Sequence, residues 1–199
     1  MPSRKGYHHG HLRRALLDAA LRLVEDKGPD GFTVAEAARA AGVSSAAPYR
    51  HFAGRRELMQ ALFAEGMERL GQMMGAAQAA ADDTPMEQFR AMGIASIQFA
   101  ADHPGYFRVM SMPEYATIEE SLIESDQFWA QAAEVLRDPQ REDGAVLFQV
   151  AARAMAHGLA TMFVDGHMQR LGVDRSLATS VADRVTRAIN PGMVPPDSE

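Results

Sequence analysis

The chain has 199 residues, of which 47% are hydrophobic, and its formal net charge is −6 at pH 7. No run of uncharged residues exceeds about a dozen, whereas a membrane helix needs about 18 or more, so we expect no membrane span. The absence of cysteine excludes a disulfide framework, a thiolate metal site and a thiol redox switch. We therefore expect a cytoplasmic protein that carries no cofactor.

The charge is unevenly distributed along the chain. Residues 1–56 carry ten Lys and Arg against five Asp and Glu, whereas residues 57–199 carry ten against twenty-one. A basic amino-terminal part thus precedes an acidic remainder, and this distribution is typical of a protein that binds nucleic acid through one end.

The first ten residues are polar and basic. Arg4 and Lys5 could contact DNA phosphates or enter the minor groove, and a solvated tail is the alternative. The histidines here match no zinc spacing and have no acidic or thiol partner nearby, so we predict no metal site. From about His11 to Lys27 apolar residues recur every three to four positions, which predicts a helix with one buried face.

A second helix is predicted after a turn at residues 28–31. Thr33 and Glu36 have the spacing of a capping box, so this helix should begin at Val34. It should be short, because Gly42 is well placed to end it in the left-handed conformation.

A third short helix follows directly. Ser44 or Ser45 can cap it, and Pro48 falls in or near its first turn, where the missing N–H costs least. Two short helices joined by a tight turn that contains glycine make a helix-turn-helix. Plain packing of two helices is the alternative for this pattern.

The stretch GVSSAAPYRHF, residues 42–52, resembles the recognition helix of TetR-like (tetracycline-repressor-like) transcriptional regulators. The family usually has Lys where this chain has Arg55. The resemblance runs from about Tyr7 to Leu62, and beyond residue 65 only the layout is similar. It implies a regulator, more often a repressor than an activator, that binds a double-stranded DNA operator and responds to a small molecule.

The third helix, from Ser45 to His51, would enter the major groove with its amino end toward the bases. Its arginine could pair bidentately with guanine, and its alanine methyl groups could touch thymine methyl groups. The candidates for base contact are Ser45, Ala46, Ala47 and Arg50. Ser44, which could cap the helix, is a further DNA-binding candidate. The candidates for phosphate contact, which the resemblance also implies, are Thr33, Tyr49, His51 and Arg55.

The rest of the sequence predicts only helices, and the whole chain is predicted to be all-α with about nine of them. We expect a helix-turn-helix DNA-binding domain over residues 1–54 and a helical ligand-binding and dimerisation domain over residues 55–199. A helix from Arg55 should be the only covalent route between them. The further helices are expected at about residues 55–81, 85–101, 106–110, 117–138, 143–165 and 174–188.

The last two helices, about 143–166 and 174–189, carry more apolar surface than one small body can bury. The first of them is so apolar that we expect it to be buried on nearly every side. The resemblance implies that both form a four-helix bundle with a second copy of the chain. Such a homodimer would read a palindromic operator.

The middle of the chain is rich in methionine and aromatic residues, which suits a cavity for a small apolar effector, although the sequence favours ordinary core for any single one of these residues. His157 and Gly158 resemble a Trp-His-Gly type of carboxy-terminal domain found in part of the family, but Arg153 and Ala154 stand where the Trp is expected. His157 could be a core histidine, a dimer contact or a pocket donor. The candidate ligand-binding residues are Phe99, Tyr106, Phe107, Met110, Phe128, Trp129, Met155 and His157.

Two other classes of function compete with a regulator. A small helical enzyme could use His157 with Asp165, Asp102 or His103, but the sequence shows no nucleophile elbow, phosphate loop or metal pair, so we predict no enzyme. A non-specific architectural DNA-binding protein is disfavoured, because the acidic body would repel the DNA that flanks the site.

Overall fold

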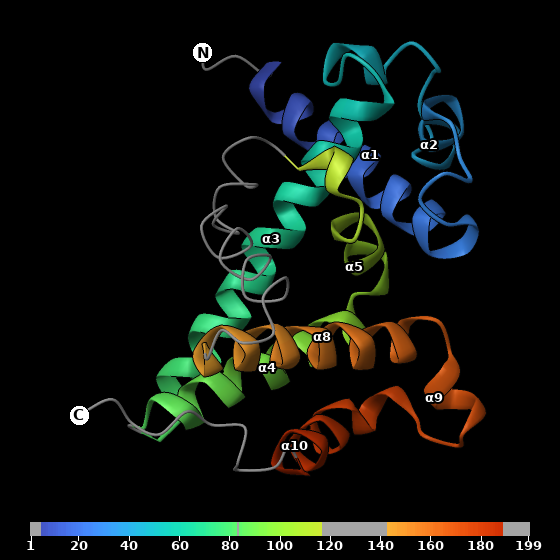
Figure 1. The fold of residues 1–199 in the computed structure, drawn as a ribbon. Coiled ribbons are helices and arrows are strands. Elements are labelled where there is room, and N and C mark those ends of the chain that lie inside the picture. The colour runs from blue at the N-terminus through green and yellow to red at the C-terminus, as the bar shows by residue number, and fades with distance from the viewer. Residues whose placement is uncertain (1–4, 83, 117–142, 189–199) are drawn as a thin grey trace. The chain divides into compact units, whose positions relative to one another are not determined.

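The computed structural model describes residues 5–82, 84–116 and 143–188, and for residues 5–10 only the backbone. These residues form eight α-helices, three short 3-10 helices and no strand, which confirms the all-α class (Figure 1). One helix of the expected nine, at residues 117–138, lies outside the described residues. Another is a 3-10 helix, and a short helix α9 (His167–Arg170) was not predicted.

The chain divides into two compact units, each of which is built from two separate stretches of sequence. The first unit contains residues 1–67 and 104–117, and the second contains residues 68–103 and 118–199. The chain therefore passes between these two units at three points. The domain boundary predicted after residue 54 stays a prediction.

The first unit contains α1 (Lys5–Lys27), α2 (Val34–Ala40), η1 (Pro48–Arg50), the first part of α3 (Arg55–Ala80), α5 (Pro104–Met110) and η2 (Pro113–Tyr115). Its core is apolar and includes Leu16, Val24, Phe32, Phe52, Leu58, Leu62 and Val109. Phe32 and Phe52 are thus buried as the sequence predicted. Helix α1 begins six residues earlier than expected, because helix propagation through residues 5–10 adds one hydrogen bond for each residue that it fixes.

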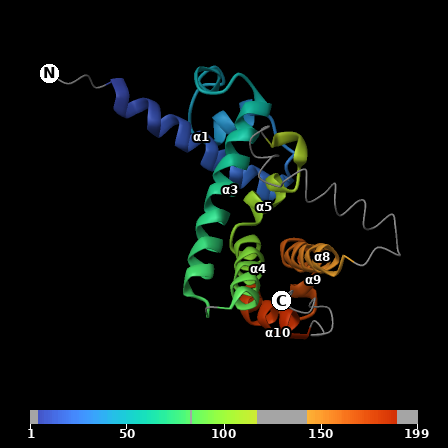
Figure 2. The same ribbon diagram turned by 60° about the vertical axis from the view of Figure 1, so that its left-hand side comes forward.

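The second unit contains the end of α3, then α4 (Pro85–Asp102), α8 (Gly144–Val164), α9, η3 (Arg175–Leu177) and α10 (Ala178–Ala188). Both α8 and α10 pack against α4, as Figures 1 and 2 show from two directions. These three helices and α9 share one core, whose buried members are Ile97, Ala101, Leu159, Phe163, Met168, Ala178 and Ala182.

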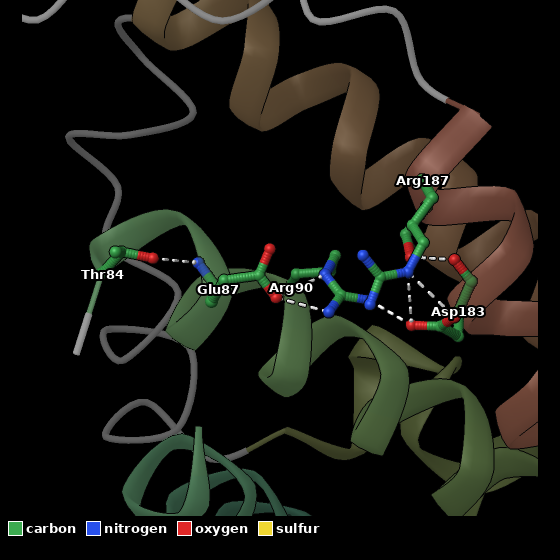
Figure 3. A network of polar contacts seen from close by, with 6 residues as sticks. Thr84, Glu87, Arg90, Asp183 and Arg187 are labelled. Atoms are coloured by element: carbon green, nitrogen blue, oxygen red, sulfur yellow. Dashed lines mark hydrogen bonds and ion pairs between the residues drawn. The ribbon is translucent and has the colours of Figure 1, made fainter. Parts of the chain in front are cut away.

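A polar network fixes α10 against α4 (Figure 3). Arg90 on α4 donates through Nε to Glu87 Oε2 at 3.0 Å, and its Nη1 forms an ion pair with Asp183 on α10. Arg187 also donates to Asp183, with Nε 3.0 Å from Oδ2. The Thr84 hydroxyl caps α4 by accepting from the Glu87 amide at 3.3 Å, so the predicted helix start is confirmed.

Helix α8 agrees with its predicted bounds but not with its predicted burial. Leu147 is 42% exposed, and Arg153, Ala154 and His157 are also exposed. The expectation of burial on nearly every side was wrong for the single chain, because α4 and α10 cover only one side of the helix. By length and composition alone, α8 is the one helix in the described residues that could cross a membrane, with 22% of its most apolar stretch buried. A single helix of this kind is weak evidence for a membrane span.

Candidate DNA-binding surface

The start of α2 is built by the predicted capping box. The Thr33 hydroxyl accepts from the Glu36 amide at 3.2 Å, and the Glu36 carboxylate accepts from the Thr33 amide at 2.8 Å. Lys27 Nζ lies 2.8 Å from Glu36 Oε1 and so ties this helix to the end of α1. The hydrogen bond from Lys27, followed by the one from the Thr33 backbone, lowers the pKa of Glu36 to about 2.

The end of α2 is also as predicted. Gly42 has a φ of +72°, in the left-handed region that favours glycine. Its amide donates to Arg39 O at 3.0 Å, and the Val43 amide donates to Ala38 O at 3.0 Å. These two bonds form a Schellman motif, which satisfies the last carbonyl groups of the helix and turns the chain sharply.

The second helix of the motif is shorter than predicted. Pro48, Tyr49 and Arg50 form one turn of 3-10 helix, and Ala47 precedes them without any side-chain cap. Pro48 has no N–H to donate to the Ser44 carbonyl, which instead accepts from the Ala47 amide at 3.0 Å. The expected cap by a serine hydroxyl and the seven-residue α-helix were therefore wrong, because proline removes the bond that would start that helix.

Most of the predicted DNA-contacting side chains in the first unit are open to solvent. Tyr49 is 59% exposed, although it is aromatic, and Arg50 beside it is exposed as well. Pro48 is buried and anchors this segment in the core. Arg4 lies outside the described residues, and Lys5 is in α1. The other exposed candidates are Thr33, Ser44, Ser45 and Ala46, whereas Ala47 and His51 are partly buried.

Arg55 differs from these residues, because its guanidinium group is bound within the first unit. Nη1 donates to the Tyr115 hydroxyl at 2.6 Å, and Nη2 donates to the Pro29 carbonyl and lies 3.2 Å from Asp30 Oδ1. The guanidinium carbon also lies 5.5 Å from the centre of the Phe32 ring. Two of the three nitrogens therefore already have acceptors in the protein.

Helix α5 is held firmly against α1 and α3 by contacts that the sequence did not reveal. The Tyr106 hydroxyl donates to Glu65 Oε1 at 2.7 Å, and the same oxygen accepts from Arg14 Nη1 at 2.5 Å. Hydrogen bonds to Asp18 and then to Glu65 raise the pKa of Arg14. Arg108 donates to the Glu25 carbonyl at 3.0 Å. No sequence spacing could have indicated the contacts of Glu65 with Tyr106 and Arg14, or that of Arg108 with Glu25, since these residues are far apart in the chain.

The candidate ligand-binding residues are divided between the units. Tyr106 is buried and Phe107 and Met110 are partly buried in the first unit, whereas Phe99 is fully buried in the second. Met155 is partly buried and His157 is exposed on α8, so His157 is not a core histidine of the single chain. Phe128 and Trp129 lie outside the described residues. A ligand site over these residues stays a prediction.

A metal-binding group is absent from the described part of the chain, since no three His, Asp or Glu side chains there are close enough to share an ion. The side chains of His8 and His9 are not described.

A short helix that ends in a Schellman motif and is followed by an exposed turn, in the basic part of the chain, is the arrangement of a helix-turn-helix DNA-binding protein. The family model for bacterial regulatory proteins of the tetR family matches residues 16–62, and that for the tetracyclin repressor-like C-terminal domain matches residues 89–188. The second match alone covers just over half of the chain. The chain therefore belongs to the TetR family of transcriptional regulators, as the sequence predicted.

Individual relatives agree with this membership. The HTH-type transcriptional regulator BetI of Brucella anthropi is 37% identical over 89 residues, which are 45% of this chain and 44% of that protein. The match thus spans less than half the length of this curated relative. Because the relatives are transcriptional regulators, the prediction that the chain is not an enzyme is confirmed.

Solved structures share the fold. A protein of unknown function from Rhodococcus sp. RHA1 is 31% identical, with a TM-score of 0.64 over 92% of this chain and 98% of that one. A TetR family transcription regulator from Marinobacter aquaeolei VT8 has a TM-score of 0.61 over 88% of this chain and 95% of that one, at 21% identity. This second likeness concerns the fold alone.

Proposed function

We propose that the chain is a homodimeric, ligand-responsive repressor that binds a palindromic operator through its helix-turn-helix and is located in the cytoplasm. The observation that carries the proposal is the segment from Ser44 to Arg50, most of whose side chains are exposed around the buried Pro48. It follows a helix with a complete capping box in the basic part of the chain. Its surface has an aromatic ring and a cation that the fold itself leaves uncovered.

In this proposal the segment enters the major groove. Arg50 pairs with guanine, and Ser45, Ala46 and Ala47 lie against neighbouring base edges. Phosphate contacts come from Thr33, Tyr49 and His51, and from Arg4 and Lys5 at the beginning of the chain. Such contacts fix the register of the protein on the duplex and make its affinity fall steeply with salt.

The second copy is proposed to cover the open side of α8 and α10. Val181, Arg184, Val185 and Ala188 line an open hollow of about 300 Å³ on α10. Leu147 on α8 and Leu177 just before α10 are 42% and 48% exposed. Apolar surface of this kind marks an interaction site more often than free surface. Two copies would place their helix-turn-helix units about 34–36 Å apart, one turn of B-DNA.

The effector is proposed to be a small apolar molecule bound by the methionine and aromatic residues of the central helices. Binding would favour a dimer whose two helix-turn-helix units are wrongly spaced for the operator. Operator binding would then weaken by the difference between the effector's affinities for this dimer and for the DNA-binding dimer. A coupling of about 1–3 kcal/mol would change operator affinity roughly five- to 150-fold. Membership in the Trp-His-Gly group stays part of this proposal.

Footprinting on a duplex selected from a random library tests the proposal. We expect one protected palindrome with two half-sites a helical turn apart, occupied by two copies of the chain. Protection that spreads evenly along the DNA would favour an architectural protein, and turnover of a substrate by the purified chain would favour an enzyme. An operator affinity that no compound of a broad apolar library alters would contradict the ligand response but not the DNA binding.

A further inference from the structure

We infer that Arg55 is a positioning residue, which clamps Tyr115 to the turn before α2, and is not a phosphate ligand. The inference rests on the proposed function and deepens it. According to this inference, α5 and η2 help to position the DNA-binding surface, although they follow the helix-turn-helix by about fifty residues of sequence.

The geometry of the guanidinium group carries the inference. Its two terminal nitrogens donate in different directions, one to the Tyr115 hydroxyl at 2.6 Å and the other to the Pro29 carbonyl and Asp30. Its carbon lies over the Phe32 ring, 5.5 Å from the ring centre. A planar fork holds its donors on separate nitrogens in fixed directions, whereas a lysine has its three donors on one nitrogen and lacks this fixed separation.

The acceptors that Arg55 joins belong to two stretches of the first unit that are far apart in the sequence. Pro29 and Asp30 belong to the turn between α1 and α2, and the capping box at Thr33 follows three residues later. Tyr115 is buried, at 6% exposure. It is the last residue of η2, two residues before the chain leaves the first unit. A shift of Tyr115 is thereby transmitted through one side chain to the turn that sets the start of α2.

The rest of α5 is packed too closely to move independently of α1 and α3. A Cβ atom added at Gly105 would lie 2.8 Å from Leu21 Cδ1 and 2.9 Å from Glu25 Cγ. One added at Gly66 would lie 3.2 Å from Tyr106 Cδ1. These close approaches and the Tyr106–Glu65 hydrogen bond hold α5 against α1 and α3, in the same compact unit as Arg55 and Tyr115.

The experiment measures operator affinity as a function of salt for the full-length chain and its variants Arg55→Lys, Arg55→Met and Tyr115→Phe. The probe is the duplex selected by the wild-type protein. Arg22→Met, which removes an exposed arginine on α1, is the control for net charge. Circular dichroism and the thermal midpoint of each variant report whether it folds.

We expect Arg55→Met and Tyr115→Phe each to weaken operator binding about tenfold, and the double variant to lose no more than either single one. Arg55→Lys should lose as much as Arg55→Met, and the slope of log affinity against log salt should stay that of the wild type. A phosphate ligand predicts the reverse: Arg55→Met lowers the slope by about 0.9, Arg55→Lys retains affinity and Tyr115→Phe has no effect. That result would overturn the inference.

Failure of the proposed function gives a different outcome. If the wild-type chain selects no discrete duplex, the proposed function fails, and the clamp is then tested by the thermal midpoints alone. Non-additive losses in Arg55→Met and Tyr115→Phe would support a clamp under those conditions, and strictly additive losses would contradict it.

Discussion

The Tyr106 hydroxyl donates a hydrogen bond to Glu65 Oε1 at 2.7 Å, across 41 residues of sequence. The ring of Tyr106 is almost fully buried, and Glu65 also holds Arg14 of α1. One carboxylate thus joins α1, α3 and α5 in the first unit. The first unit is therefore stabilised by a segment that comes about fifty residues after the helix-turn-helix in the chain.

We predict that Tyr106→Phe lowers the free energy of unfolding by about 1–2 kcal/mol, because a hydrogen bond to a charged acceptor is lost while the ring is kept. Urea unfolding at one fixed protein concentration measures this, since the stability of a dimer depends on concentration. Tyr49→Phe is the matched control: its ring is 59% exposed, so the change should be within about 0.5 kcal/mol. Equal losses in both variants would contradict the role of the Glu65 contact.

Two glycines of α3 are predicted to respond oppositely to substitution by alanine. At Gly71 nothing lies within 4 Å of an added Cβ, so the better helix propensity of alanine should stabilise the protein by up to about 1 kcal/mol. At Gly66 the Cβ would lie 2.6 Å from Met110 Sδ, and displacing α5 side chains should cost about 1–3 kcal/mol. Thermal melts of Gly66→Ala and Gly71→Ala test this. A stabilised Gly66→Ala would show that α5 is loosely packed.

Acid should weaken the network between α4 and α10. Arg90 lowers the pKa of Glu87, and Arg187 followed by Arg90 lowers the pKa of Asp183. Carboxylates with lowered pKa contribute stability that is complete above their ordinary values of 4.5 and 3.8 and is lost as the pH falls through the folded values. Arg90→Met should therefore be less stable than the wild type at neutral pH, and this difference should shrink as the pH falls from about 5 to about 3.

Thermal midpoints across this range measure the acid effect. Arg187→Met serves for comparison. The Arg187 side chain is 60% exposed, and within this network it pairs with Asp183 alone, so its loss should have a smaller effect on stability. If the thermal midpoints of the wild type and Arg90→Met differ by the same amount from neutral to acid pH, the ion pairs of Arg90 make no pH-dependent contribution to stability.

The features that the sequence predicted correctly depend on residues that are only a few positions apart in the chain. The capping box at Thr33 and Glu36 and the left-handed Gly42 depend on residue types at fixed short spacings, and both are present. The same local reasoning underestimated Pro48. Its place in the first turn was predicted, but the loss of its N–H reduces the expected α-helix to one 3-10 turn.

Other features depend on packing between distant segments, which spacing does not encode. The pairing of Arg55 with Tyr115 spans 60 residues, and the resemblance, which implies a phosphate contact for Arg55, gives no sign of it. For α8, composition correctly indicated an apolar helix. It could not indicate which side the chain itself covers, because that depends on where α4 and α10 lie.

Arg50 is predicted to supply sequence specificity. Arg50→Ala should weaken binding to the selected operator by about 1–3 kcal/mol and should relax the preference at one base position of each half-site. Fluorescence anisotropy with the operator and its single-base variants measures both effects. Arg170→Ala removes an exposed arginine of α9 in the second unit and should leave binding unchanged. A uniform loss across all base variants would make Arg50 a phosphate contact.

The exposed face of α10 is predicted to hold the dimer together. Ala188 is exposed and lines the hollow beside Arg184, so Ala188→Arg adds a bulky second cation there without removing any core side chain. In a twofold dimer each change occurs twice, and the like charges should raise the dissociation constant of the dimer steeply. Analytical ultracentrifugation should show monomers, and operator binding should be lost with them. Leu171→Arg, at a position of 71% exposure after α9, should stay dimeric. A dimeric Ala188→Arg that still protects the operator would place the interface elsewhere.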